Sequence, residues 1–86
     1  MGYRGRPIGN IFPHPKTRGE HMHNARLRAR MSQDKLAKMS GVSATTIGCA
    51  ETDKVVPHID IVELLADALG VSIDEYIGHK VEVRKR

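Results

Sequence analysis

The pattern of apolar and polar positions between Met31 and Glu51 predicts two short helices that share one buried seam. Apolar or small residues recur there at helical spacing on both sides of a turn at Ser40-Gly41-Val42. Ser32 and Ser43 stand where the helices should begin, because a serine hydroxyl accepts hydrogen bonds from the free N–H groups of a first helical turn. The residues expected to form the seam are Leu36, Ala37, Val42, Ile47 and Ala50.

Two small residues indicate how closely these helices approach each other. Ala37 and Gly41 lie where the helices should meet, and neither side chain keeps the backbones apart. Two short helices joined by a glycine-containing turn form a helix-turn-helix, a motif whose second helix enters the major groove of DNA. The spacing therefore predicts this motif and makes DNA a candidate ligand.

The same periodicity predicts three further helices. They span about residues 20–30, about residues 59–69 and residues 73–77, and Ser72 caps the last of them. Gly70 and Gly78 suit the C-terminal ends of the last two helices. The apolar stripe of the fourth helix consists of Ile59, Val62, Leu65, Ala66 and Leu69. The methionines expected to fill the core are Met22, Met31 and Met39.

Three segments follow from these elements. Residues 1–20 hold three of the four prolines and four of the eight glycines, which predicts an extended basic arm rather than a helix. Residues 21–78 form the helical domain, and residues 79–86 form a basic tail or an edge strand. The predicted fold class is all-α, a compact bundle of five short helices with an extended N-terminal arm and a short C-terminal tail.

Composition supports this fold and limits the chemistry. A chain of 86 residues makes one small domain, and with two Tyr, one Phe and no Trp its core must be built mainly from aliphatic side chains. The single cysteine, Cys49, excludes an internal disulfide and fits a reducing cytosol, so we expect a cytoplasmic protein. No apolar run is long enough to span a membrane, and no cofactor is expected.

Charge is segregated along the chain. Residues 1–30 carry seven Lys or Arg and one acid, and residues 55–79 carry five acids and neither Lys nor Arg. Residues 80–86 carry four bases and one acid, and the whole chain has a formal net charge of +4. Basic ends around an acidic block favour one face directed toward a polyanion, with ordinary surface charge as the alternative. Charge thus keeps nucleic acid among the candidate partners.

Residues 22–78 resemble the DNA-binding domains of phage repressors and Cro proteins, the XRE-like helix-turn-helix family. The matching segments are M-S-Q-D-K-L-A, S-G-V-S-A-T-T-I, E-T-D-K, Pro57 and A-D-A-L-G-V-S-I-D-E-Y-I-G. The last of these segments follows the first at the spacing expected for the family, which makes the resemblance more specific than a single helix-turn-helix pattern. The resemblance implies a lambda-repressor-like bundle that binds double-stranded DNA.

The resemblance also assigns roles to matching positions. Gln33 would bind a phosphate and brace the start of the third helix, and Arg26 and Glu51 would form a partly buried ion pair between the first and third helices. A solvated glutamine and two unrelated surface charges are the alternatives. The residues implied at the bases are Ala44, Thr45 and Cys49, and those implied at phosphates are Gln33, Ser43, Thr46, Thr52 and Lys54.

The predicted recognition helix departs from the family pattern. Its sequence, A-T-T-I-G-C-A, contains no Arg, Lys, Asn or Gln, the side chains that read guanine or adenine through paired hydrogen bonds. Thr45 can make one hydrogen bond or touch a thymine methyl group, and Gly48 costs about 1 kcal/mol of helix propensity relative to Ala. We therefore expect affinity to depend on phosphate contacts and on the arm, whose candidate DNA-binding residues are Arg4, Arg6, Lys16 and Arg18.

Other kinds of chemistry find little support in the sequence. His21 and His23 lie two positions apart, so they point in different directions on a helix, and no metal site is expected. Cys49 is expected to be a quiet thiol, with a redox sensor as the alternative. No nucleophile with its base and acid is identifiable and no glycine-rich phosphate loop is present, so we expect no enzyme activity.

The expected function is sequence-specific DNA binding by a transcriptional regulator, a repressor that binds an inverted-repeat operator as a homodimer. One rival is an antitoxin that also binds a toxin protein, with the arm as the partner-binding segment. The other rival is a protein-interaction module that has kept the fold and lost DNA readout. The candidate dimer contacts are Leu64, Tyr76, Ile77, Val81 and Val83.

Overall fold

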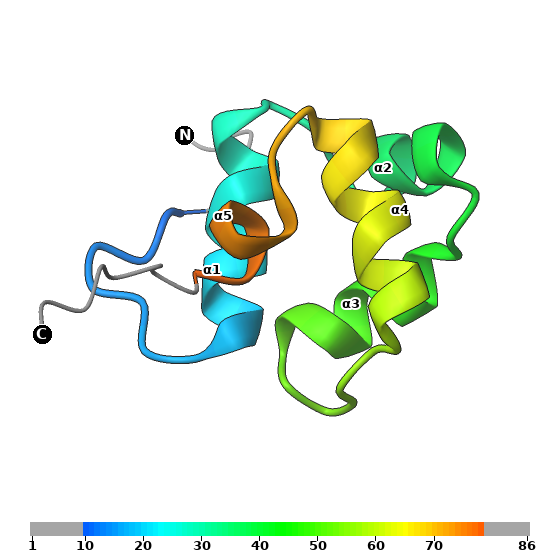
Figure 1. Cartoon of the computed structure of the whole chain (residues 1–86). Coiled ribbons are helices and arrows are strands. Elements are labelled where there is room, and N and C mark those ends of the chain that lie inside the picture. Colours follow the sequence, from blue (N-terminus) through cyan, green and yellow to red (C-terminus); the bar gives the residue numbers. More distant parts are fainter. Residues whose placement is uncertain (1–9, 79–86) are drawn as a thin grey trace, which may run out of the picture.

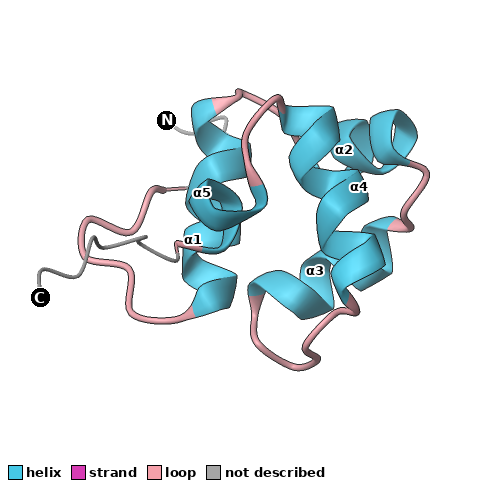
Figure 2. Ribbon diagram, in the orientation of Figure 1, coloured by secondary structure: helices cyan, strands magenta, loops and turns pink. Residues whose placement is uncertain are grey.

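A computed structural model describes residues 10–78 of the chain. The described residues form five α-helices and no strand (Figure 1, Figure 2). Helix α1 packs against α3 and α5, and α2 packs against α3 and α4. The prediction of an all-α bundle of five short helices is therefore confirmed. The helices are α1 (Arg18–Arg28), α2 (Gln33–Ser40), α3 (Ala44–Glu51), α4 (Ile59–Leu69) and α5 (Ile73–Ile77).

Serine residues begin three of the helices, as predicted. The hydroxyl oxygens of Ser32, Ser43 and Ser72 each accept a hydrogen bond from the backbone N–H three residues further along the chain. Each bond satisfies one of the N–H groups that a helix leaves free at its start. The starts of α2, α3 and α5 thus follow directly from local sequence.

Gly41 has a different role from the one that its size suggested. Its φ angle is 82°, and a Cβ atom added there would meet no atom within 4 Å. The left-handed backbone at the end of α2, and not a close helix contact, therefore favours glycine. Gly70 and Gly78 end α4 and α5 in the same way, with φ angles of 74° and 76°.

The core joins the helix-turn-helix to the other helices. Leu36, Val42, Ile47 and Ala50 are buried as predicted, and Ala37 is half-buried against them. Burying each larger aliphatic side chain contributes about 1.5–3 kcal/mol to folding. The remaining buried hydrophobic residues of the core are Met22, Ala25, Val62, Leu65, Ala66 and Tyr76.

Two predictions about the core are wrong. Ile59, which belongs to the predicted stripe of α4, is 54% exposed, and Met39 is 52% exposed. Met39 is the last residue but one of α2 and Ile59 is the first residue of α4, so both lie in a terminal turn, which has a neighbouring turn on one side only. Met31, in contrast, packs against the core as a half-buried residue.

Helix α1 begins at Arg18, earlier than predicted, so residues 18–20 are helical and not part of an extended segment. Thr17 caps the helix by accepting a hydrogen bond from the backbone N–H of Glu20. The carboxylate of Asp53 accepts hydrogen bonds from the Thr17 hydroxyl at 2.6 Å and from the Gly19 N–H at 3.0 Å. An acidic group at a helix N-terminus is stabilising, so Asp53 helps to fix this early start.

Gly19 allows α1 to approach α3 closely. A Cβ atom at this position would lie 2.6 Å from the carbonyl oxygens of Ala50 and Glu51. Gly19 was predicted to belong to the extended arm, but it lies in α1, where the absence of a side chain lets two helix ends meet.

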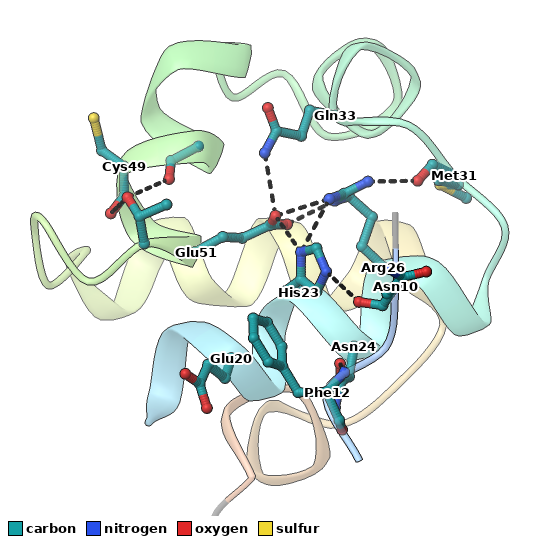
Figure 3. Close-up of polar contacts among 12 residues, drawn as sticks. Asn10, Phe12, Glu20, His23, Asn24, Arg26, Met31, Gln33, Cys49 and Glu51 are labelled. Atoms are coloured by element: carbon teal, nitrogen blue, oxygen red, sulfur yellow. Dashed lines mark hydrogen bonds and ion pairs between the residues drawn. The ribbon is translucent and has the colours of Figure 1, made fainter. Parts of the chain in front are cut away.

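The described part of the arm is docked on α1. The side-chain amide of Asn24 is fully buried and bonds both backbone groups of Phe12, because Phe12 N–H donates to Oδ1 at 2.8 Å and Nδ2 donates to Phe12 C=O at 2.9 Å. His23 Nε2 lies 3.0 Å from the carbonyl oxygen of Asn10, and the Phe12 and His23 rings meet edge to face (Figure 3). Asn24 and His23 thus fix the path of the chain between Asn10 and Phe12.

Several predictions concern residues outside the described range of 10–78. They include the arm residues Arg4 and Arg6 and the tail or edge strand of residues 79–86 with Val81 and Val83. Within residues 10–78, no helix is long and apolar enough to cross a membrane.

Candidate nucleic-acid interface

A shallow hollow follows the outer side of α3 and the start of α2, and we call it the reading surface. It contains all the residues expected at bases and three of those expected at phosphates. The other two expected phosphate contacts, Ser43 and Thr46, lie at the start of α3. The residues that line the reading surface are Gln33, Ala44, Thr45, Gly48, Cys49, Thr52 and Lys54.

Helical periodicity explains why these side chains point outward. Ile47, Ala50 and Glu51 are buried, so they define the inner side of α3. With 3.6 residues per turn, Thr45 and Cys49 then lie on the opposite side. The burial of one face by the core therefore presents the other face to a ligand.

Hydroxyl groups at both ends of α3 are already hydrogen-bonded. The Ser43 hydroxyl donates to Thr46 Oγ1 at 2.9 Å, which leaves the Thr46 hydroxyl proton able to donate outward. The Thr52 hydroxyl donates to the carbonyl oxygen of Gly48 at 2.9 Å. Thr52 must therefore turn its hydroxyl away from α3 before it can donate to a phosphate.

The outer side of α3 itself carries no charge. Ala44 and Thr45 present methyl groups, and the Thr45 hydroxyl adds one polar group. The half-buried thiol of Cys49 points away from the polar contacts behind α3 (Figure 3). This chemistry suits contact with thymine methyl groups and at most one base hydrogen bond per threonine.

A buried ion pair joins α1 to α3 behind the reading surface. Arg26 Nε donates to Glu51 Oε2 at 2.7 Å, and Arg26 Nη2 donates to Glu51 Oε1 at 2.9 Å. Arg26 is 3% exposed and Glu51 is 5% exposed, so these are not two separate surface charges. Two parallel charge-assisted bonds fix direction as well as distance, so the pair sets how α3 is held against α1.

Three other groups complete this polar network (Figure 3). Arg26 Nη1 donates to the carbonyl oxygen of Met31 at 2.8 Å, and Gln33 Nε2 donates to Glu51 Oε1 at 3.1 Å. His23 Nδ1 lies 3.4 Å from Glu51 Oε1. Gln33 therefore connects the buried pair to the reading surface, where its side-chain amide lies beside Gly48.

Tyr76 lies in the core and cannot be the dimer contact that the sequence suggested. Its side chain is fully buried, and its hydroxyl has no hydrogen-bond partner within the described residues. Burial raises the pKa of this hydroxyl, as does the nearby Glu51 carboxylate, while Arg26 acts in the opposite direction. The prediction failed because α5 has only five residues, too few for a periodicity that identifies its buried side. Of the other candidates, Leu64 is 47% exposed and Ile77 is half-buried.

The described basic residues of the arm lie near the start of α1. Lys16 and Arg18 are both exposed, and Arg18 is the first residue of the helix rather than part of an extended segment. The backbone N–H of Lys16 donates to Glu20 Oε1 at 2.8 Å. Neither residue lines the reading surface.

Sequence reasoning missed the residues that attach the arm and close the α1–α3 contact. The contacts of Asn24 with Phe12 span 12 positions, and those of Asp53 with Thr17 and Gly19 span 36 and 34 positions. Asp53 itself has a left-handed backbone, with a φ angle of 62°, which aspartate tolerates in a turn. Local sequence contains no signal for the distant partners of its carboxylate.

The histidines of α1 have separate surroundings. His21 packs against Gly78, whereas His23 faces Glu51 and the arm. Within residues 10–78, no group of three or more His, Cys, Asp or Glu side chains is placed to hold a metal ion.

The fold and the reading surface together define an all-α DNA-binding domain of the helix-turn-helix class. The sequence model of the helix-turn-helix family matches residues 22–76. The chain belongs to this family of DNA-binding regulators, in its XRE-type form.

One solved structure supports the fold independently. A crystal structure described as a hypothetical transcription factor, NHTF, from Neisseria is similar to this chain with a TM-score of 0.67. The likeness covers 79% of this chain and 88% of that chain at 19% sequence identity, so it shows the fold alone. No curated protein matches the sequence.

Proposed function

We propose that this protein is a sequence-specific transcriptional regulator, a repressor that binds an inverted-repeat operator as a homodimer. The observation that most strongly supports this function is the grouping of the candidate base and phosphate contacts on one exposed surface of a helix-turn-helix. Helix α3 has eight residues and is therefore about 12 Å long, a size that the major groove accepts.

Base contacts in this proposal are few and mostly apolar. The methyl groups of Ala44 and Thr45 face thymine methyl groups, and the Thr45 hydroxyl makes one hydrogen bond to a base edge. Cys49 adds a further weakly polar contact. Because paired hydrogen bonds to guanine or adenine are absent from this helix, sequence-dependent shape of the DNA supplies part of the specificity.

Phosphate contacts hold the domain in place. Gln33 stands at the N-terminus of α2, and Ser43 and Thr46 stand at the N-terminus of α3, where free N–H groups and the helix dipole favour an anion. Lys54 adds a positive charge at the other end of α3. The buried contact between Arg26 and Glu51 keeps the elements behind these groups in a fixed arrangement.

Dimerisation lengthens the stretch of DNA that the protein contacts. One recognition helix covers only a few base pairs, and two half-sites that lie one helical turn apart on DNA multiply the affinity. An inverted repeat then reflects the two-fold symmetry of the protein.

Selection of binding sites from random DNA tests this proposal. We expect an enriched inverted repeat with thymine-rich half-sites whose centres lie about 10 base pairs apart. A Thr45→Glu variant that keeps its helical circular-dichroism signal should lose the enrichment. Leu64→Glu adds the same charge on the exposed side of α4 and should retain it.

The basic arm is tested by the salt dependence of binding. Deleting residues 1–9 removes Arg4 and Arg6 and leaves the hydrogen bonds between Phe12 and Asn24 in place. If both arginines neutralise phosphates, the slope of log affinity against log salt should become shallower by about 2. Arg4→Gln together with Arg6→Gln in the full-length chain should give the same change, and an unchanged slope in both variants would exclude the arm contact.

A protein-interaction module is the second candidate, because the outer side of α3 lacks the side chains that read bases through paired bonds. Absence of enrichment at low salt would favour this candidate over the regulator. Binding of the Thr45→Glu variant to the same protein partner as the wild type would then show that the partner uses another surface.

A further inference from the structure

Three exposed aliphatic residues follow α3 and precede the body of α4, and we call the segment from Val55 to Ile59 the apolar connector. Val55 is 45% exposed, Val56 is 78% exposed and Ile59 is 54% exposed. Figure 1 shows this connection as the loop between α3 and α4. All three side chains lie within five positions of the chain and are turned out of the core, which favours a surface that contacts another molecule.

The apolar connector continues directly from the reading surface. The backbone N–H groups of Lys54 and Val55 both point at the carbonyl oxygen of Cys49, at 2.9 and 3.4 Å. Lys54 and Cys49 themselves line the reading surface. Whatever binds the connector therefore lies next to the recognition helix.

Charges at the two ends of the connector are opposite. Lys54 precedes it, and no described residue forms an ion pair with this lysine. Asp60 follows it, and its side chain is 78% exposed; its carboxylate lies 3.5 Å from Nδ1 of His58, which is also exposed. A segment that is positive at one end and negative at the other is complementary to an antiparallel copy of itself.

We infer that the apolar connector binds a second copy of this chain across a two-fold axis near Pro57. The antiparallel arrangement sets Lys54 opposite Asp60 of the partner subunit and Val55 opposite Ile59 of the partner subunit. Pro57 has no N–H group to donate, so side-chain packing rather than a strand ladder holds the copies together. This inference rests on the proposed function, because it names the interface of the proposed dimer.

The arrangement agrees with the position of α3. Each α3 ends beside its connector, so two copies that meet there place their recognition helices on either side of the axis. The alternative contact through Leu64 is less favourable, because that residue shares the exposed side of α4 with three acids. Two copies that met there would bring together like charges of Asp60, Glu63 and Asp67.

Sedimentation equilibrium of the full-length chain without DNA tests the interface. The wild type should be a dimer, and Val56→Glu should weaken self-association by about tenfold or more because it buries an unpaired charge. Leu64→Glu, the matched control, should leave the dimer unchanged. A monomeric wild type, a dimeric Val56→Glu variant or a monomeric Leu64→Glu variant would each overturn the assignment.

Charge exchange tests the antiparallel register. Lys54→Asp and Asp60→Lys should each weaken the dimer, because each places like charges opposite one another. The double variant restores opposite charges and should recover the wild-type dimer. If the double variant associates no better than the single ones, the proposed register is wrong.

The outcome is separable from that of the DNA-binding proposal. Folded Val56→Glu should still bind a single half-site with the affinity of the wild type and lose only the gain from a second half-site. A wild type that dimerises through the connector but selects no DNA would contradict the regulator and retain the interface. If the wild type selects an inverted repeat while Val56→Glu remains dimeric, the regulator is retained and the proposed interface is contradicted.

Discussion

The inner side of α3 carries Ile47, Ala50 and Glu51, whereas its outer side carries Ala44, Thr45 and Cys49. The inner side is buried, and its Glu51 carboxylate receives three hydrogen bonds of 3.1 Å or shorter from Arg26 and Gln33. The outer side has small, uncharged groups. Polar contacts in this domain are thus concentrated where α3 is held, not where it faces a ligand.

This contrast indicates how a domain with a sparse reading surface can still dock on DNA in one orientation. Phosphate contacts give no sequence information directly, but they depend on the exact spacing of helix ends. The Arg26–Glu51 pair fixes that spacing from behind. Contacts through small methyl groups become selective only when the backbone that carries them is held in one place. The following variants test this contrast between the buried inner side and the outer side of α3.

Glu51→Ala should have the largest effect on the buried side. It leaves Arg26 buried without a counter-charge, and the loss of one partner of a buried ion pair costs about 3–5 kcal/mol. Urea denaturation followed by circular dichroism measures this loss as a lower midpoint. Glu63→Ala, which removes an exposed acid of α4, should change stability by no more than about 0.5 kcal/mol. Equal midpoints for the two variants would contradict a stabilising role for the pair.

Gly19→Ala should have the next largest effect. The added methyl group would lie 2.6 Å from two carbonyl oxygens at the end of α3, and overpacking of this kind costs about 1–3 kcal/mol. The melting temperature should fall, and weaker DNA binding should accompany it because α1 and α3 are pushed apart. An unchanged melting temperature would show that the two helix ends can separate freely.

Tyr76→Phe should stabilise the protein by about 1 kcal/mol, because it removes a buried hydroxyl that has no hydrogen-bond partner among residues 10–78. Burial raises the pKa of this hydroxyl, so the folded state keeps its proton where the unfolded chain releases it, above a pH of about 10. The stability of the wild type should therefore fall further than that of the variant as pH rises through this range. Parallel stability curves against pH would contradict the burial of the hydroxyl.

Gly48→Ala should have an effect no larger than that of Tyr76→Phe, and it tests the outer side. The added methyl group would lie 3.5 Å from Gln33 Oε1, an ordinary contact, so the gain in helix propensity of about 1 kcal/mol should appear as added stability. Gly19→Ala is its natural comparison, since the same change has the opposite sign there. Destabilisation by Gly48→Ala would mean that Gln33 cannot shift and that the reading surface is held as tightly as the buried side.

Local sequence predicted most of the fold because the relevant signals are local. Ser32, Ser43 and Ser72 cap helices through bonds to residues three positions away, and the seam of Leu36, Val42, Ile47 and Ala50 follows from helical period. The resemblance to a known family placed Arg26 and Glu51 opposite each other, although 25 positions separate them. No local pattern contains that pairing.

Other features of the fold depend on contacts between distant parts of the chain, which local sequence does not encode. Periodicity cannot distinguish Met39 and Ile59 from core residues, because their spacing fits the apolar stripe although both side chains are exposed. The docking of Phe12 on Asn24 joins a backbone group to a distant side chain, and backbone groups are the same at every residue. The roles of the residues on the reading surface remain predictions, because they concern a ligand and not the fold.

Asp53 has a topological consequence. The hydrogen bond from the Thr17 hydroxyl to the Asp53 carboxylate closes a loop of 36 positions that contains α1, α2 and α3. Extracellular domains of similar size often secure such a loop with a disulfide, which a chain with one cysteine cannot form. Hydrogen bonds to a carboxylate make the closure reversible, so the loop that contains α1 and the two helices lining the reading surface can open without chemical reduction.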